Sequence, residues 1–241
     1  MKFDFTGSSF SLYSKIKFRQ PTSYAAFIDT GKESILSFSP ELFFRINGRK
    51  IITRPMKGTI KRGLSFAQDK KLKDELRKGK KTQAENLMIV DLLRNDLGRI
   101  SNKINVPKLF KVEKYPTLFQ MTSTVEAKLK DNLKIKDIFS SLFPCGSVTG
   151  APKIKTMEII KELEKEPRGV YTGAIGYISP GREACFNVGI RTVRIKGKKG
   201  ELGVGGGIVC DSKAEDEYEE ALLKAEFFKE GIEKVLFSDR M

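Results

Sequence analysis

The sequence contains no histidine among its 241 residues. This absence excludes a Ser-His-Asp triad, a Cys-His catalytic pair and any zinc site that depends on histidine ligands. Any proton transfer that the chain catalyses must therefore be carried out by carboxylates, lysine, tyrosine or water.

Cysteine and long apolar runs are also scarce. The three cysteines, Cys145, Cys185 and Cys210, are spaced too widely for a CxxC metal site and form no paired disulfide framework, so we expect reduced thiols. No run of about 18 apolar residues occurs that would span a membrane. The first ten residues lack the basic start and apolar centre of a signal peptide, and we therefore expect a cytoplasmic protein without a membrane segment.

The chain is strongly basic, with a net charge of +15 and a pI near 9.6. Such a charge raises the possibility of nucleic-acid binding, because clustered cations release counterions when they neutralise phosphates. The densest lysine cluster, residues 70–81, is interleaved with Asp69, Asp74 and Glu75 and has almost no aromatic residues. This pattern favours a solvated helix face, and we expect no nucleic-acid partner.

Alternating apolar and polar positions predict strands, and longer periodic segments predict helices. Strands are expected at Tyr24–Ile28, Ile35–Phe38, Leu42–Ile46, Lys50–Thr53, Leu109–Glu113, Met121–Leu129, Val170–Ser179, Phe186–Ile195 and Gly200–Val204. Helices are expected at Leu64–Lys78, Ala84–Leu93, Lys136–Leu142, Pro152–Glu164 and Lys213–Val235. Adjacent strands mixed with helices favour an α+β fold over a doubly wound sheet. Without a repeat or a linker, we expect one compact unit cut from a larger protein.

Gly203-Val-Gly205-Gly206-Gly207 is the densest glycine segment, and it lies between a predicted strand and a predicted helix. Its backbone amides are suited to bind an anion, although its spacing does not match a dinucleotide fingerprint. A tight turn explains the same glycines equally well when the segment is considered alone.

Two groups of carboxylates are candidates for a metal site. Glu217, Glu220 and Lys224 share one face of the last predicted helix, where a surface ion pair is the simpler explanation. Glu85 begins an unusually apolar helix, where it either complements the helix dipole or binds a metal. Oxygen ligands of this kind suit Mg²⁺, which usually takes only one or two protein carboxylates.

Seven segments distributed over the whole chain resemble, in order, motifs of the chorismate-utilising enzymes, and in particular their aminodeoxychorismate synthase branch. The segments are Ser39–Phe44, Thr53–Thr59, Glu85–Asp96, Gly146–Lys153, Tyr171–Tyr177, Ile190–Thr192 and Gly205–Ser212. The resemblance implies a large α+β sandwich in which antiparallel sheets lie between helices, in the order α/β/β/α. It also implies one chorismate-binding catalytic domain, residues 1–241, that lacks the family's N-terminal portion.

By this resemblance, Lys57 is the nucleophile that attacks chorismate, and ammonia then displaces it to give 4-amino-4-deoxychorismate, a precursor of p-aminobenzoate and folate. Glu41 is the general acid that protonates the departing hydroxyl. The ammonia is expected to come from a glutamine amidotransferase subunit. Without the motif, Lys57 would be read as a solvated surface lysine and Glu41 as a strand-edge charge.

The resemblance also assigns binding residues. Glu85 and Glu220, with Glu217 nearby, are implied ligands of Mg²⁺. The implied substrate-binding residues are Thr59, Ser147, Tyr171, Arg191, Gly205, Gly206, Gly207 and Lys224, and Thr149 is a further residue that lines the pocket. An arginine buried without a partner would be costly, so Arg191 is expected to meet an anion.

Two departures from the family pattern bear on function. Gln120 stands where many relatives, notably anthranilate synthases, have a histidine linked to pyruvate elimination, and those enzymes typically have alanine at position 57. Both features favour amination over anthranilate formation. Since Met1 aligns well inside the family's conserved region, an inactive fragment remains an alternative, as does anthranilate synthase component I.

Overall fold

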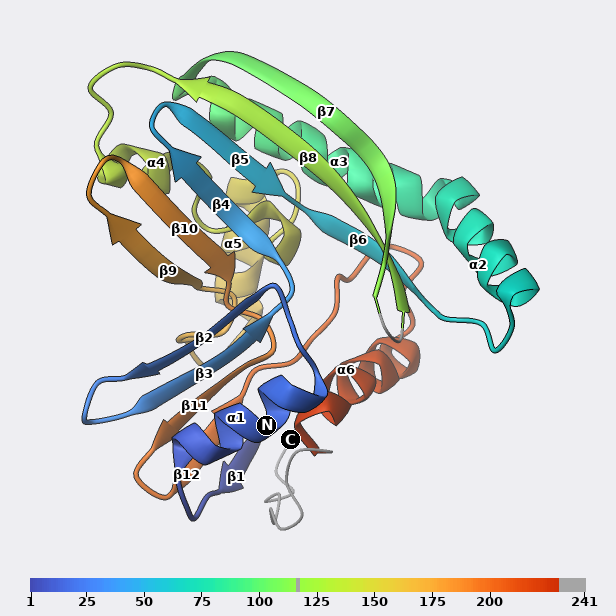
Figure 1. Ribbon diagram of the computed structural model, residues 1–241, viewed down its shortest axis with the longest axis vertical. Coiled ribbons are helices and arrows are strands. Elements are labelled where there is room, and N and C mark those ends of the chain that lie inside the picture. The colour runs from blue at the N-terminus through green and yellow to red at the C-terminus, as the bar shows by residue number, and fades with distance from the viewer. Residues whose placement is uncertain (116–117, 230–241) are drawn as a thin grey trace. The chain divides into compact units, whose positions relative to one another are not determined.

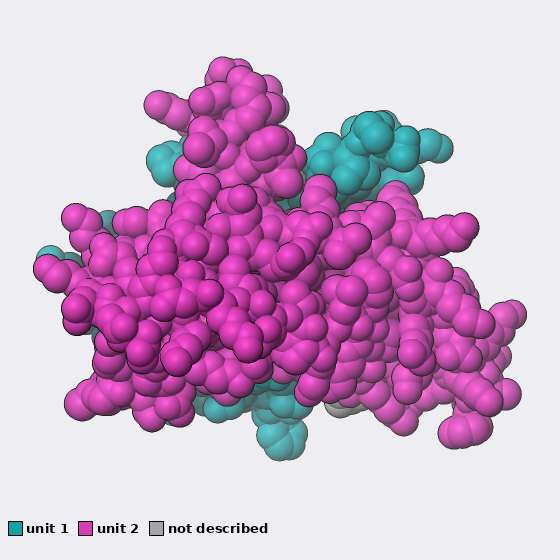
Figure 2. Space-filling view, turned by 90° about the horizontal axis from the view of Figure 1, so that it is seen from above, with its two compact units in different colours: residues 1–41, 166–176, 187–241 teal, residues 42–165, 177–186 magenta. Residues whose placement is uncertain are grey.

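The computed structural model describes residues 1–115 and 118–229, which form two compact units. Unit 1 comprises residues 1–41, 166–176 and 187–241, and unit 2 comprises residues 42–165 and 177–186 (Figure 2). Each unit is described by itself below. The expectation of one catalytic domain spanning the chain stays a prediction.

Unit 1 is built on a five-stranded sheet with the strand order β1-β12-β11-β3-β2 (Figure 1). Its strands are β1 (Lys2–Asp4), β2 (Tyr24–Asp29), β3 (Ser34–Ser39), β11 (Thr192–Lys196) and β12 (Lys199–Leu202). Its helices are α1 (Ser9–Arg19) and α6 (Ala214–Lys229). The end predicted for the last helix, Val235, lies outside the described residues.

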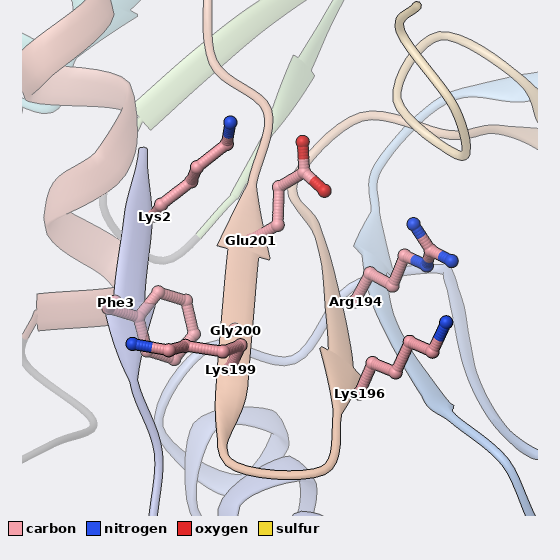
Figure 3. A pocket seen from close by; sticks show the side chains of 7 residues that line it. All are labelled: Lys2, Phe3, Arg194, Lys196, Lys199, Gly200 and Glu201. Carbon is pink, nitrogen blue, oxygen red and sulfur yellow. The ribbon is translucent and has the colours of Figure 1, made fainter. Parts of the chain in front are cut away.

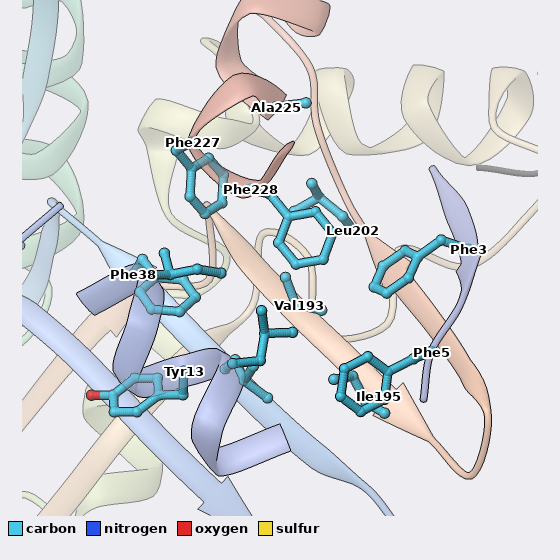
Figure 4. Packing of buried hydrophobic residues seen from close by; sticks show 13 residues of the cluster. Phe3, Phe5, Tyr13, Phe38, Val193, Ile195, Leu202, Ala225, Phe227 and Phe228 are labelled. Carbon is cyan, nitrogen blue, oxygen red and sulfur yellow. The ribbon is translucent and has the colours of Figure 1, made fainter. Parts of the chain in front are cut away.

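The two helices cover one face of this sheet, and the core of unit 1 lies between the sheet and the helices (Figure 4). Alternate residues of the strands, such as Phe3, Phe38 and Val193, point to this face, as the period of two in a strand requires. The fully buried ring of Phe228 on α6 lies 4.9 Å from that of Phe3. The sequence of α6 therefore has an apolar face that docks it on the sheet, which leaves its acidic face available.

Unit 2 contains most of a seven-stranded sheet with the order β6-β8-β5-β4-β10-β9, in which β7 also pairs with β8. Its strands are β4 (Leu42–Asn47), β5 (Lys50–Arg54), β6 (Met56–Lys61), β7 (Ser101–Lys114) and β8 (Leu118–Leu129). Strands β9 (Ala174–Ser179) and β10 (Glu183–Val188) complete it. Its helices are α2 (Phe66–Lys78), α3 (Lys80–Gly98), α4 (Ile135–Leu142) and α5 (Lys153–Leu163), with a short 3-10 turn at Gly146–Val148.

Helix α3 lies along β7 and β8 (Figure 1). Its buried apolar residues Ile89, Val90, Leu93 and Leu97 recur at helical spacing and face the sheet. A separate group of phenylalanine rings packs around Phe139 of α4. In contrast, α5 has no buried residue, although it carries five apolar side chains.

Strand β7 has features that discourage further pairing at its outer side. It contains Pro107, a series of exposed lysines and three irregularities of register against β8. Within β7, Glu113 pairs with Lys111 at 2.9 Å and with Arg54 of β5. Burial alone would raise the pKa of Glu113, but these two cations together lower it below its ordinary value.

The predicted α+β class with antiparallel sheets is confirmed, and most predicted elements are present within a few residues. The predicted strand Phe186–Ile195 is wrong, because the chain turns between β10 and β11 and Arg191 has a positive φ of 49°. Helix α1 and strands β1 and β6 were not predicted. In the part of the chain that is described, no helix has the length and apolar character needed to span a membrane.

Candidate functional site

The glycine-rich segment lies in unit 1, in the irregular stretch 203–213 between β12 and α6, and it is not a tight turn. The ring of Tyr171 packs directly on it. A Cβ atom at Gly203 would lie 2.2 Å from Cγ of Tyr171, and one at Gly205 would lie 2.8 Å from the Tyr171 hydroxyl oxygen. Glycine is therefore required by the close approach of this ring, which brings two predicted substrate-binding positions together.

The predicted cation-binding carboxylates of α6 lie beside the same segment. Oε1 of Glu217 accepts a hydrogen bond of 2.5 Å from the Ser212 hydroxyl, and a Cβ atom at Gly206 would lie 2.5 Å from Oε2 of Glu217. Nζ of Lys224 lies 2.5 Å from Oε1 of Glu220 and donates to the Gly205 carbonyl at 3.1 Å. The i,i+4 ion pair exists, and it forms part of a cluster that includes the glycine backbone.

Arg191 lies in unit 1 in the turn before β11, where its backbone carbonyl accepts a hydrogen bond of 3.0 Å from the amide of Phe38. Loss of hydration lowers the pKa of its guanidinium below the ordinary value. Among residues 1–115 and 118–229, no side chain forms an ion pair with this guanidinium. A partly buried cation of this kind is favourable only when an anion reaches it.

Glu41, the last residue of the first segment of unit 1, is only 4% exposed, so it is not a strand-edge surface charge. Its backbone amide donates to the Ser39 hydroxyl at 3.3 Å, and its carbonyl accepts from the amide of Val188 at 3.1 Å. A buried carboxyl group suits a general acid, because burial disfavours the charged form.

Lys57 lies in unit 2 on β6, within an irregularity of the pairing between β6 and β8 that spans Met56 to Thr59. Such irregularities turn a side chain away from the regular alternation of a strand and are frequent beside active sites. Gly58 has a φ of 86°, and a Cβ atom there would lie 2.1 Å from Cγ2 of Thr82 on α3. The partly buried lysine is therefore held by a backbone conformation that its glycine neighbour permits.

Thr59 and Gln120 meet across β6 and β8. The Thr59 hydroxyl donates to Oε1 of Gln120 at 3.1 Å, and Nε2 of Gln120 donates to the Gly58 carbonyl at 3.1 Å. The side-chain oxygen and nitrogen of Gln120 thus both bind β6, at the two residues that follow Lys57. Gln120 was predicted only as a departure from the family pattern, because its structural role depends on contacts between β6 and β8.

Glu85 is partly exposed on α3, and its neighbour Asn86 is fully buried. Oδ1 of Asn86 accepts a 2.5 Å hydrogen bond from the Ser123 hydroxyl of β8. Nδ2 of Asn86 has no partner among the residues that the structure describes. The spacing of α3 could have indicated Asn86, because it falls on the buried face of an otherwise apolar helix.

Ser147 and Thr149 lie in the segment between α4 and α5. The hydroxyl of Ser147 lies 3.2 Å from Sγ of Cys145, and that of Thr149 donates to the Cys145 carbonyl at 3.0 Å. Asp96 and Lys153 belong to motifs that carry the family resemblance but were not predicted as site residues, and they form an ion pair in which the side chains are 3% and 11% exposed.

Within unit 1, the structure therefore brings together Tyr171, Gly205, Gly206, Glu217 and Lys224, and Glu220 joins them through Lys224. Gly207 follows Gly206 in the same segment. Over residues 1–115 and 118–229, no group of three or more acidic or cysteine side chains is gathered closely enough to hold a metal. Two carboxylates three residues apart still fit Mg²⁺, since this ion keeps several waters and needs only one or two protein carboxylates.

A hollow of about 380 Å³ lies elsewhere in unit 1, lined by residues of β1, β11 and β12 (Figure 3). It contains none of the predicted site residues. Three of its four cations have carboxylate partners, because Lys2 lies 3.0 Å from Glu166, Lys199 lies 2.6 Å from Asp4 and Arg194 lies 2.7 Å from Glu33. Its lining residues are Lys2, Phe3, Arg194, Lys196, Lys199, Gly200 and Glu201.

Comparisons with known proteins agree in pointing to one family. Residues 1–230 match the family model described as chorismate binding enzyme. The chain is 43% identical over 219 residues to a probable chloroplastic aminodeoxychorismate synthase of Oryza sativa, covering 89% of this chain and 24% of the relative. It is 38% identical to aminodeoxychorismate synthase component 1 of Bacillus subtilis, covering 93% of this chain and 48% of the relative. The chain thus spans half or less of the length of these relatives.

Anthranilate synthases are also similar. Component 1 of Aquifex aeolicus is 36% identical over 95% of this chain and 47% of the relative. The crystal structure of anthranilate synthase component I from Streptococcus pneumoniae superimposes with a TM-score of 0.86 at 36% identity, covering 94% of this chain and 51% of that one. The isochorismate synthase MenF of Escherichia coli, at 22% identity and a TM-score of 0.85, shows likeness of fold alone.

Proposed function

This chain belongs to the chorismate binding enzyme family, and we propose that it carries out the chorismate-aminating reaction of aminodeoxychorismate synthase. The observation that carries the proposal is Lys57, which lies in the motif Thr53–Thr59 at the irregular part of β6. By resemblance, this lysine separates the aminating enzymes from anthranilate synthases. Relatives named aminodeoxychorismate synthase, at 38–43% identity, support the same reading.

The reaction requires Lys57 to act as a neutral amine, because the ammonium form has no lone pair. Lys57 is partly buried in the irregular part of β6.

In the first step of the proposed reaction, the Lys57 nitrogen forms a bond to chorismate as the bond from C4 to its hydroxyl oxygen breaks. Glu41 gives its proton to the departing oxygen, so that water leaves and not hydroxide. Ammonia then forms the new carbon–nitrogen bond and displaces Lys57, and the proton released by the incoming nitrogen restores Glu41. The burial of Glu41 is consistent with a group that begins the cycle protonated.

The two carboxylates of chorismate need cationic and hydrogen-bonding partners. Arg191 supplies a guanidinium without an ion-pair partner in the described residues, while Lys224 and Tyr171 flank the backbone of Gly205. Arginine binds a carboxylate through two parallel hydrogen bonds. We assign substrate binding to these residues together with Gly206, Gly207, Thr59 and Ser147.

Glu85, Glu217 and Glu220 are the proposed ligands of Mg²⁺. When bound, the ion would offset the negative charge of a substrate carboxylate. In the structure, Glu220 pairs with Lys224 and Glu217 accepts from Ser212, so binding of the ion requires these contacts to be exchanged. A glutamine amidotransferase subunit is the proposed source of ammonia.

Anthranilate synthesis is the second candidate, and it is favoured by the similarity to anthranilate synthases at 36% identity. The contacts of Gln120 argue against it. This side chain holds Thr59 and Gly58 at the position where, by resemblance, anthranilate synthases have the histidine linked to pyruvate elimination.

The test is an ammonia-dependent assay of the purified chain with chorismate and Mg²⁺, to which a lyase that releases p-aminobenzoate is added. We expect p-aminobenzoate from the unsubstituted chain and from Lys61→Ala, an exposed lysine of the same strand, and none from Lys57→Ala. Anthranilate formed without the lyase would replace the proposal with the second candidate. A folded chain that forms neither product, even with a relative's remaining segment added, would refute both.

A further inference from the structure

An ion pair joins α3 to the start of α5 in unit 2. Nζ of Lys153, the first residue of α5, lies 2.5 Å from Oδ2 of Asp96 near the end of α3. Both side chains are withdrawn from water, which distinguishes this pair from the exposed pairs of unit 2 such as Arg94 with Asp91. The backbone of Asp96 is also engaged, because its carbonyl accepts a 2.5 Å hydrogen bond from the Ser141 hydroxyl.

The same ammonium group closes a loop. Nζ of Lys153 also donates to the carbonyl of Leu142, the last residue of α4, at 2.9 Å. Residues 143–152 lie between these two positions. The residue that follows this segment is therefore bonded to the residue that precedes it, and both are fixed to α3 through Asp96.

The placement of the charge indicates that it serves the loop and not its own helix. A cation in the first turn of α5 is unfavourable to that helix, because the N-terminal end of a helix dipole is positive. The Leu142 carbonyl and Asp96 lie near the C-terminal ends of α4 and α3, where a cation is favourable. Lys153 thus stabilises the junction of three helices.

The loop lies against α3 at a second point. A Cβ atom at Gly146 would lie 2.5 Å from Cδ2 of Leu92, so the backbone of the loop is pressed against this side chain. Ser147 and Thr149 follow directly, and both contact Cys145. The positions of the two hydroxyl groups therefore depend on how the loop is seated.

We propose that Lys153 and Asp96 are positioning residues, which hold residues 143–152 on α3 so that Ser147 and Thr149 are presented to chorismate. Neither side chain touches the substrate in this proposal. The part that concerns chorismate rests on the proposed function, whereas the seating of the loop does not.

The rate at which a thiol reagent modifies Cys145 measures opening of the loop, and this measurement needs no substrate. The side chain of Cys145 is buried, at 5% exposure, and it lies within the segment that the ion pair closes. A thiol reagent can modify it only when the loop opens. The rate is measured for Cys145 by mass spectrometry of its peptide, which separates it from Cys185 and Cys210.

We expect Lys153→Met and Asp96→Asn to increase the rate of Cys145 modification at least about tenfold, and Lys153→Arg to restore protection. The matched control is Arg62→Met. This variant removes the partly buried ion pair between Arg62 and Asp69, which lies at the start of α2. This control should change the rate less than about twofold. A rate that stays unchanged in folded Lys153→Met, or that rises equally in Arg62→Met, would overturn the proposal.

The kinetic arm uses the ammonia-dependent assay. Lys153→Met should raise KM for chorismate by about 10- to 100-fold with a smaller change in kcat, because the groups that bind the substrate are displaced. Arg62→Met should leave KM unchanged. Failure of the unsubstituted chain to form product would count against the proposed function alone, since the modification of Cys145 decides the seating of the loop separately.

Discussion

Replacement of Arg191 by methionine should stabilise the protein while it weakens binding of chorismate. The guanidinium is partly buried and has no ion-pair partner in the described residues, so folding removes water from a charge without offsetting the loss. Methionine keeps the Cβ atom and a similar length, and the positive φ of 49° is therefore retained. The substitution changes the charge and leaves the backbone strain in place.

The expected gain in the free energy of unfolding is about 1–2 kcal/mol, the usual size for removal of an unfavourable functional group. For a chain of this size, each kcal/mol raises Tm by roughly 2–4 °C. The pKa of Arg191 is lowered in the folded state, so its cost to stability applies at every pH below that lowered pKa. It disappears only as the pH rises past the ordinary pKa of an arginine side chain, and the gain should be constant from about pH 6 to 9.

Urea unfolding and thermal melting measure this gain, and Arg194→Met is the matched control. Arg194 lies three residues along the chain and pairs with Glu33 at 2.7 Å, so its loss should lower stability by up to about 1 kcal/mol. Opposite signs for the two variants support the reasoning. If Arg191→Met lowers the free energy of unfolding by about 1 kcal/mol or more, the guanidinium is compensated in the folded chain and the reasoning is refuted.

Three further substitutions test the packing and the charges. Phe228→Ala should lower the free energy of unfolding by about 3–5 kcal/mol, because its ring is fully buried against Phe3, and a urea midpoint that barely changes would contradict the docking of α6. Gly203→Ala should lower it by about 1–3 kcal/mol, because the added carbon would overlap the ring of Tyr171, and an unaltered tyrosine signal in near-UV circular dichroism would contradict this. The lowered pKa of Glu113 contributes stability that is present above about pH 4.5 and is lost as the pH falls through the folded-state pKa. Glu113→Gln should therefore show a weaker loss of stability between pH 4.5 and 3 in urea unfolding.

Local patterns in the sequence were sufficient for most of the fold. The alternation of apolar and polar residues was sufficient for strands β2 to β5, whose bounds were predicted within about one residue. Helix α1 was missed although its signals are local: Ser8 caps it through the amide of Ser11, and Leu12, Tyr13 and Ile16 form its buried face. The alternating pattern of the strands that follow is a stronger signal than the three buried positions of this helix.

The break between β10 and β11 has a cause that no local pattern contains. A Cβ atom at Gly189 would lie 2.5 Å from the carbonyl oxygen of Val170, which is 19 residues away in the sequence. This close approach of two backbones forces the turn that ends in Arg191. Apolar residues alternate on either side of the turn, at Phe186, Val188 and Ile190 and then at Val193 and Ile195, and the change of phase between these two groups is the local sign of the break.

The candidate site was predicted from motifs and not from physical pattern. Lys57 has no property in the sequence that separates it from a surface lysine, and its place in an irregular part of β6 depends on pairing with β8. The pair formed by Asp96 and Lys153 joins residues 57 positions apart, so that only the packing of three helices reveals it. Roles of this kind depend on contacts between elements, which periodicity does not specify.

Two edge strands of the seven-stranded sheet, β7 and β9, differ in their tendency to pair with strands of other chains. Strand β7 is protected by lysines, Pro107 and irregular register, and these features oppose edge-to-edge association. Strand β9 ends the described strand order at the other side, carries no charged residue and exposes Tyr177 and Ile178. In concentrated solution, aggregation should therefore begin at β9, and a single lysine at position 178 should suppress it without any change to the core.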